Sequence, residues 1–317
     1  MGAKGQKIMR VCCIIFVSIV VLIGAFVAIG FSTGGIHTGS RKQISSKNAT
    51  ITNSYSKLFL KCQGQFQCDV NVNYDSSISS AVVQFVTLSN DDKIMDRIKS
   101  IDAQVVDNSL DVKVIGQDFN FWKMFYFSDT TTQVTVTLPA VKLESARYES
   151  AVGSFDFKGN ADMDIGTVTF SVSTGSITVT DMSMGTGDIS SSTGTVNVRG
   201  VSAKDIKIST STGSIYGNVK SASKVKATTS TGSIELDIGA ASSESTFELS
   251  TNTGSVTSNI TGFSGKYKGS TSTGSVKVVV AGSDVTNGKK ESSGTVGDGK
   301  GDFKASASTG SVNLTFK

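Results

Sequence analysis

Residues 211–215 read Ser-Thr-Gly-Ser-Ile, and variants of this five-residue phrase recur through the second half of the chain. Its glycine stands at positions 175, 194, 213, 232, 254, 274, 294 and 310, so neighbouring glycines are 19, 19, 19, 22, 20, 20 and 16 residues apart. A repeat of about 20 residues indicates one supersecondary unit per repeat, with each unit stacked on the last.

Apolar columns accompany the glycines. The second residue after each glycine is always β-branched: Ile177, Val196, Ile215, Ile234, Val256, Val276, Val296 and Val312. The seventh and fifth residues before each glycine are mostly large and apolar, and hydroxyl residues alternate with them. This period of two is that of a β-strand. Glycine accepts positive φ, so we expect it at a corner between two strands of one coil.

These patterns predict an all-β fold, a parallel β-solenoid with coils of about 20 residues that occupies residues 151–317. The block around Gly294 fits worst, because Asn287 and Lys289 stand where apolar residues are expected. We expect a bulged or partly looped coil there.

The first half of the folded region is less regular. Residues 49–150 are expected to form an irregular N-terminal β region, with a capping helix near residues 91–101, where Ile94, Ile98 and Ile101 have helical spacing. Residues 32–48 are rich in Gly, Ser and Lys and are interpreted as a flexible stalk.

The N-terminus has the composition of a membrane anchor. Residues 1–10 contain three basic side chains, and residues 11–31 contain no charge. Such a run is long enough for one transmembrane helix. The alternative is a cleaved signal peptide, with a small-residue site at residues 28–30. We expect a single-pass membrane protein with the basic tail inside and the solenoid outside, at the cell surface, although basic residues flank both sides of the span.

The four cysteines fall into two pairs. Cys12 and Cys13 lie at the inner edge of the expected span, as acylation candidates or simply as apolar residues. Cys62 and Cys68 flank five residues, and we expect a disulfide there, the alternative being two buried thiols. Three sequons make Asn48, Asn259 and Asn313 glycosylation candidates.

Small hydroxyl residues form two further columns, four and two positions before each glycine. The binding-face candidates among them are Ser171, Ser173, Ser190, Ser192, Ser209, Ser211, Thr228 and Ser230. Such a face is able to contact or carry glycans, or to order water as ice-binding faces do. The alternative is that serine is used because it stacks closely and bonds its ladder neighbours.

The most aromatic run of the chain is residues 119–127, which includes Phe121, Trp122, Phe125 and Tyr126. It is interpreted either as core and capping contacts or as an exposed patch for a partner.

Charge and composition argue against several functions. The net charge is +4 and no long basic run occurs, so nucleic acid is not an expected partner. The single histidine, His37, lies in the expected stalk, and the carboxylates fall in different columns. The loop at residues 298–302 has too few ligands for calcium. We therefore expect no catalytic residue, metal or cofactor.

From about Gln133 onward the chain resembles the putative-adhesin family of surface proteins. The resemblance rests on the strand ending at Pro139 (VTVTLP), a degenerate turn at Gly153 (VGSFDF) and the recurrent STGSI-type corners. It implies a repetitive extracytoplasmic β-solenoid, often tethered to a membrane, with no catalytic residues to assign.

Two functions follow as hypotheses. The first is a non-enzymatic, membrane-anchored module for adhesion or binding to a glycan or a surface protein. The second is a structural protein that self-associates, because residues 313–317 end the chain inside an expected strand and offer it as an open edge.

Overall fold

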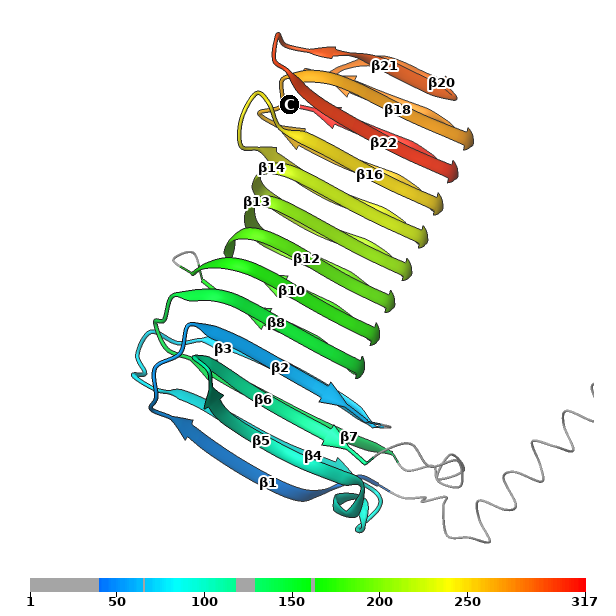
Figure 1. The fold of residues 1–317 in the computed structure, drawn as a ribbon. Helices are drawn as coiled ribbons and strands as arrows, with labels where there is room; N and C mark the ends of the chain where they lie inside the picture. Colours follow the sequence, from blue (N-terminus) through cyan, green and yellow to red (C-terminus); the bar gives the residue numbers. More distant parts are fainter. Residues whose placement is uncertain (1–39, 65, 118–128, 161–162) are drawn as a thin grey trace, which may run out of the picture.

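The computed structural model describes residues 40–64, 66–117, 129–160 and 163–317, and these form an elongated stack of β-coils (Figure 1). The first strands are β1 (Lys42–Ile51), β2 (Lys57–Gln63), β3 (Gln67–Tyr74), β4 (Ala81–Ser89), β5 (Ile98–Val106), β6 (Ser109–Gly116) and β7 (Thr130–Leu138). The middle strands are β8 (Leu143–Val152), β9 (Phe155–Lys158), β10 (Asp164–Thr174), β11 (Ile177–Thr180), β12 (Ser183–Thr193), β13 (Val196–Thr212), β14 (Ile215–Thr231), β15 (Ile234–Ala240), β16 (Thr246–Thr253) and β17 (Val256–Thr261). The last are β18 (Gly265–Thr273), β19 (Val276–Val280), β20 (Ser283–Lys289), β21 (Glu291–Val296), β22 (Gly301–Thr309) and β23 (Val312–Phe316).

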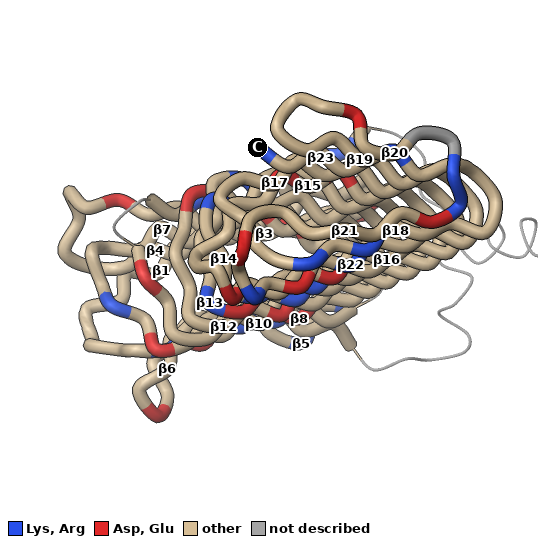
Figure 2. Tube along the Cα trace, turned by 90° about the horizontal axis from the view of Figure 1, so that it is seen from above, with Lys and Arg blue, Asp and Glu red and all other residues tan. Residues whose placement is uncertain are grey.

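Each coil contributes one strand to each of two layers, which are joined at the glycine corners (Figure 2). The first layer contains β8, β10, β12, the second halves of β13 and β14, and β16, all parallel. The second layer contains β9, β11, the first halves of β13 and β14, β15 and β17, also parallel. The coils are in register, with Ile177 beside Val196 and Ile215 beside Ile234. The prediction of a parallel, solenoid-like all-β stack is therefore confirmed in this part of the chain.

The core lies between the two layers and consists of the predicted columns. The residue two positions after the glycine is fully buried in every coil except at Val296, which is half-buried. Aromatic rings pack in two groups within the core. In the coil β8–β9, Tyr148 stacks on Phe155 at 4.0 Å between ring centroids, and in the coil β22–β23, Phe303 packs edge-on to Phe316 at 5.5 Å.

Residues 42–48, expected in the stalk, belong instead to β1, which pairs antiparallel with β4. The stretch expected as a capping helix near residues 91–101 contains one 3-10 turn, η1 (Ile94–Arg97), and then enters β5. The isoleucines with helical spacing are also compatible with this turn followed by an extended strand, and β5 gains pairing with β6. The expected helix is therefore wrong.

The N-terminal β region extends the stack. The coil β2–β3 lies against β8–β9 on one side and against β6–β7 on the other, with parallel pairing throughout. β4 and β5 then close this end by antiparallel pairing with β7 and β6. Lys47 of β1 donates from its Nζ to the carbonyl oxygen of Ile101 on β5 at 2.8 Å, so a charged side chain covers part of this edge.

The C-terminal end also departs from chain order. The last coil, β22–β23, lies between β16–β17 and β18–β19 and pairs with both. β20 and β21, in the block expected to be a looped coil, run antiparallel against β19 and β18 and close the stack. The expectation that residues 313–317 offer an open edge is therefore wrong, because β23 is hydrogen-bonded on both sides.

Residues 11–31, the expected membrane span, lie outside the described residues. Among the residues that the structure does describe, no helix is long and apolar enough to cross a membrane.

Candidate functional site

The corner glycines fix where every side chain of a coil points. Gly213 has φ of 146°, and a Cβ atom placed on it would lie 2.1 Å from the carbonyl oxygen of Gly194 in the coil beneath. The other corners from Gly175 to Gly274 have φ between 138° and 145°. An L-residue is therefore excluded both by backbone conformation and by space. The result is a regular corner that presents the same two faces in every coil.

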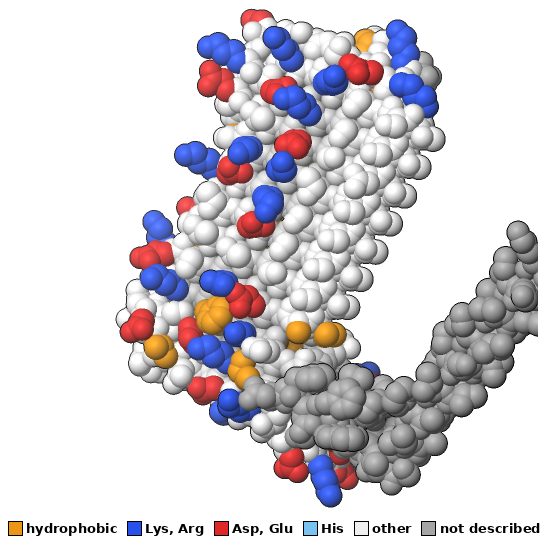
Figure 3. Space-filling model, turned by 45° about the vertical axis from the view of Figure 1, so that its right-hand side comes forward, with side chains coloured by type: hydrophobic (Ala, Val, Ile, Leu, Met, Phe, Trp, Pro, Cys, Tyr) orange, Lys and Arg blue, Asp and Glu red, His pale blue; other side chains and the backbone are white. Residues whose placement is uncertain are grey.

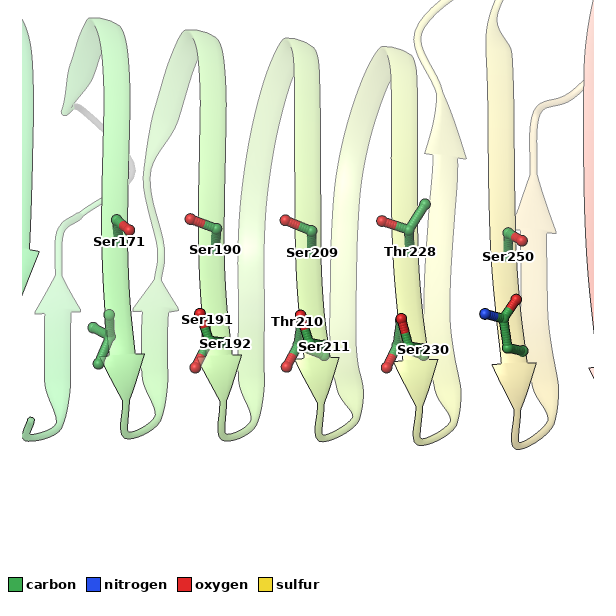
Figure 4. A pocket seen from close by; sticks show the side chains of 13 residues that line it. Ser171, Ser190, Ser191, Ser192, Ser209, Thr210, Ser211, Thr228, Ser230 and Ser250 are labelled. Atoms are coloured by element: carbon green, nitrogen blue, oxygen red, sulfur yellow. The ribbon is translucent and has the colours of Figure 1, made fainter. Parts of the chain in front are cut away.

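The hydroxyl face consists of the outward residues four and two positions before each corner glycine. On β10, β12, β13, β14 and β16 these residues are Ser171, Ser173, Ser190, Ser192, Ser209, Ser211, Thr228, Ser230, Ser250 and Asn252. All but Ser173 line a shallow groove of 470 Å³ that crosses the coils (Figure 4). The structure thus brings the predicted serine and threonine candidates together on one face, with Ser173 in an adjoining depression beside Cys62.

The hydroxyl face carries no charge along its two columns. Charged residues of the same layer lie further from the corner, in ion pairs such as Lys207 with Asp188 at 3.1 Å and Lys224 with Asp205 at 3.5 Å. Figure 3 shows a broad band without charged side chains over the middle coils. An uncharged, hydroxyl-rich surface favours partners that form neutral hydrogen bonds.

Most outward hydroxyls of this face have no protein partner. Within the part of the chain that the structure describes, Ser192, Ser211 and Ser230 form no hydrogen bond through their side chains. Two members of the face do: Ser190 donates to the carbonyl oxygen of Phe170 at 3.5 Å, and Ser250 accepts from Ser306 at 3.0 Å. The alternative that these serines exist to bond their ladder neighbours therefore applies only locally. The remaining hydroxyls are available to solvent or to a ligand.

A second hydroxyl ladder points inward and was not recognised from the sequence. It occupies the position three residues before the glycine, and each hydroxyl donates to the carbonyl oxygen of a corner glycine in the adjacent coil. The pairs are Ser191 to Gly175 at 2.9 Å, Thr210 to Gly194 at 3.0 Å, Thr229 to Gly213 at 2.9 Å, Thr251 to Gly232 at 2.8 Å and Thr271 to Gly310 at 2.7 Å. The sequence did contain a signal for this ladder. These positions are separated from the apolar columns of the same strand by an even number of residues, so their side chains point to the same, inward side of the strand.

The cysteine pair lies at the start of the hydroxyl face. A disulfide joins Cys62 on β2 to Cys68 on β3, with 6.1 Å between the two Cα atoms. Both cysteines are buried, and the bridge closes the turn between the two strands of this coil.

The sequon asparagines occupy different environments. Asn48 is exposed on β1 and not in a stalk. Asn259 is half-buried on β17 and donates from its Nδ2 to Asp237 at 2.8 Å, and Asn313 is half-buried on β23 between two paired strands. Of the three, Asn48 has the most accessible side chain, and its glycosylation stays a prediction.

Several candidates lie outside the described residues: Cys12, Cys13, Phe121, Trp122, Phe125 and Tyr126. In the described part, no group of three or more His, Cys, Asp or Glu side chains is placed to hold a metal ion. Asp302, from the Gly-rich loop, pairs with Lys304, and the hydrogen bond to this carboxylate raises the pKa of Lys304.

The chain is similar to a solved structure described as a putative adhesin from Parabacteroides distasonis, with 14% identity over 86% of this chain and 97% of that one and a TM-score of 0.42. A structure described as a putative adhesin from Bacteroides fragilis gives 14% identity, coverage of 87% and 97%, and a TM-score of 0.39. A structure described as a putative cell adhesion protein from Clostridium sporogenes gives 12% identity over 87% of this chain and 100% of that one, with a TM-score of 0.28.

No curated protein matches the chain. The profile of the family described as Toastrack DUF4097 matches residues 67–315, which is most of the chain and nearly all of the coil stack. The chain therefore belongs to the Toastrack DUF4097 family, and the family resemblance inferred from its sequence is confirmed.

Proposed function

We propose that this protein is a non-enzymatic binding module, anchored in a membrane by residues 11–31, that presents its hydroxyl face outside the cell to a neutral surface glycan. The observation that carries the proposal is the contrast between the two hydroxyl ladders. Inward hydroxyls such as that of Thr210 are used by the fold, whereas outward hydroxyls such as that of Ser211 have no protein partner in the described part of the chain.

The geometry of the face suits an extended polymer. Parallel strands place equivalent residues about 4.8 Å apart from coil to coil, and residues two apart along a strand are about 6.6 Å apart. The hydroxyl face is therefore a regular grid of short donors and acceptors. A polysaccharide chain is able to form many weak hydrogen bonds along such a grid at once. Its affinity would then come from the number of these bonds and not from the strength of any one of them.

The charge distribution supports a non-enzymatic role. Hydrolysis of a glycan requires two carboxylates at a set separation on either side of the scissile bond. Here Asp188 and Asp205 lie in different columns and each faces a lysine. The hydroxyl face itself contributes no titratable group that would act as an acid or a base.

The test is an array of neutral polysaccharides probed with labelled protein. The variant Ser192→Lys/Ser211→Lys/Ser230→Lys places three charges on the hydroxyl face and should lower binding at least about tenfold. The matched control Thr167→Lys/Thr186→Lys/Thr246→Lys adds the same charge to exposed positions of the same layer, away from the hydroxyl columns. It should stay within about threefold of the unmodified protein.

Absence of binding to every neutral glycan, or equal loss in both variants, contradicts the proposal. If the protein instead binds a surface protein, and only the hydroxyl-face variant abolishes that binding, the hydroxyl face is still the binding surface but its partner is a protein and not a glycan.

A further inference from the structure

A hollow on the second layer, on the opposite side of the stack from the hydroxyl face, has the chemistry of a small-ligand site. Its volume is 340 Å³, and its lining residues are Asn197, Arg199, Tyr216, Gly217, Glu235 and Asp237. These residues come from three adjacent coils, through β13, β14 and β15. In this column Asn197 lies beside Tyr216, and Tyr216 lies beside Glu235.

Gly217 lines the floor of this hollow. It is half-buried and lies in register between Val198 and Leu236, both fully buried. Its φ is 127°, and a Cβ atom placed on it would lie 1.7 Å from the carbonyl oxygen of Val198. Unlike the corner glycines, Gly217 lies within a strand. Glycine inside a strand is typical of a bulge or of a close backbone approach, and the pairing of β13 with β14 shifts register between Val198 and Val201.

Asn218, which lies between Arg199 and Asp237 in the order of the coils, turns its side chain away from the hollow. Its Oδ1 accepts a hydrogen bond from the backbone N–H of Gly200 at 2.8 Å, and it does not line the hollow. Arg199 and Asp237 therefore lie on either side of a gap two coils wide, about 10 Å between their strands. They form no ion pair with each other within the described residues, and the hollow between them has room for a six-membered ring.

The polar groups around the gap keep hydrogen-bonding capacity. Within the described residues, Arg199 and Glu235 form no ion pair, and Arg199 only donates from its Nε to Asn197 at 3.3 Å. Asp237 accepts from Asn259 at 2.8 Å and retains its second carboxylate oxygen. Tyr216 is 38% exposed, although the large apolar residues of this fold are mostly buried.

We propose that this hollow binds a single saccharide ring. The face of the Tyr216 ring would cover the apolar C–H face of a pyranose. The carboxylates of Glu235 and Asp237 would accept hydrogen bonds from sugar hydroxyls, and the Arg199 guanidinium would donate to them. This inference rests on the proposed function in one respect: a protein displayed outside the cell is exposed to glycans. The site is separate, because it uses the other layer and different residues.

The experiment uses the full chain in detergent micelles and ligand-observed NMR. The probes are glucose, galactose, mannose and N-acetylglucosamine, each measured by saturation transfer. We expect at least one sugar to receive saturation. Tyr216→Ala should weaken its binding at least about tenfold, Glu235→Gln by a smaller factor, and Tyr216→Phe by less than about threefold, because the ring face is kept.

Two control variants separate this site from the hydroxyl face. Thr257→Ala removes a hydroxyl one coil beyond Glu235 and should leave sugar binding unchanged. The triple lysine variant of the hydroxyl face should also keep monosaccharide binding even where it loses polysaccharide binding. The proposal is overturned if no sugar receives saturation, or if Tyr216→Ala, shown by circular dichroism to be folded, binds as well as the unmodified protein.

Discussion

The corner glycine is the residue on which each coil depends. Gly213→Ala places a Cβ atom against the carbonyl oxygen of Gly194 and strains a backbone at φ of 146°. We expect a loss of about 3 kcal/mol in the free energy of unfolding, from clash and strain together. Urea denaturation followed by circular dichroism measures it. Ser211→Ala, two residues away and outward, is the control and should change stability by less than about 0.5 kcal/mol. Equal stability of the two variants would show that the corner relaxes.

Burial of the central column gives a second prediction at this scale. Ile215 is fully buried between coils, so Ile215→Asp places an unpaired carboxylate in the core at a cost of several kcal/mol. We expect this variant to be insoluble or unfolded on expression. Ser211→Lys is the comparison, because its side chain points to solvent, and it should fold and melt like the unmodified protein. A melting curve unchanged by Ile215→Asp would contradict the inward assignment of this column.

Tyr55 makes the stability of the folded protein depend on pH. Its hydroxyl is buried without a hydrogen-bond partner among the described residues, and burial raises the pKa of Tyr55 to about 12. The folded state therefore holds this proton more tightly than the unfolded state. The resulting stability is full below pH 10 and is lost as the pH rises from 10 to about 12. Burial raises the pKa of Tyr148 in the same direction.

The variant Tyr55→Phe tests this account. It should be more stable than the unmodified protein at pH 7 by about 1 kcal/mol, because an unsatisfied buried hydroxyl is removed. Its stability should also fall less steeply between pH 10 and 12, with Tyr148 accounting for the remaining fall. Denaturation midpoints at pH 8, 10 and 11.5 provide the measurement. A parallel fall in both proteins would mean that Tyr55 titrates normally.

At the scale of elements, the last coil of the sequence lies in space between two coils that precede it in the chain. β22 pairs with β16 and β18, and β23 pairs with β17 and β19. In a solenoid stacked in chain order, removal of the last coil would expose one new edge and leave the rest intact. Here we expect truncation after residue 300 to separate β18–β21 from the stack and give aggregated or partly unfolded protein.

Complementation is the matched control for that truncation. A synthetic peptide of residues 297–317, added during refolding, should restore soluble protein with the circular dichroism of the full chain. A truncated protein that is soluble and melts normally without the peptide would show that β16 and β18 are able to pair directly.

The sequence predicts the coils but not the order in which they stack. The column through Ile215 and the glycine corners were predictable, because burial and positive φ restrict the residue types that are allowed there. The corner before Val312 resembles the corner before Val256, so nothing local shows that the last coil inserts between two others. The only signal was the polar pair Asn287 and Lys289, which marks the antiparallel strand β20.

The candidate site was predictable in part. Alternation placed Ser192 and Ser211 outward correctly, since strand parity depends only on the apolar columns. The hollow beside Tyr216 was missed because it depends on how Asn218 bonds to Gly200, which is a contact between coils. Gly217, standing in a column where its neighbours are Val198 and Leu236, was the available signal.

At the scale of the whole molecule, one stack of coils carries both of the proposed binding surfaces, the hydroxyl face on the first layer and the hollow on the second. At both ends of the stack antiparallel strands follow the parallel coils: β1, β4 and β5 at one end, and β20 and β21 at the other. Its interior hydroxyls brace the corners, while its exterior hydroxyls lie in a regular uncharged grid. We infer that the inward ladder serves the fold and the outward ladder serves a ligand.

One pair of measurements tests that division directly: the thermal midpoint and the affinity for a neutral polysaccharide, taken on two variants. Ser192→Ala/Ser211→Ala/Ser230→Ala should keep its midpoint and lose at least about tenfold in affinity, because the removed hydroxyls have no protein partner. Thr210→Val should lose about 1 kcal/mol of stability and keep its affinity, because that hydroxyl bonds Gly194. The reverse pattern, with the outward alanines unfolding the protein or leaving its affinity unchanged, would contradict the account.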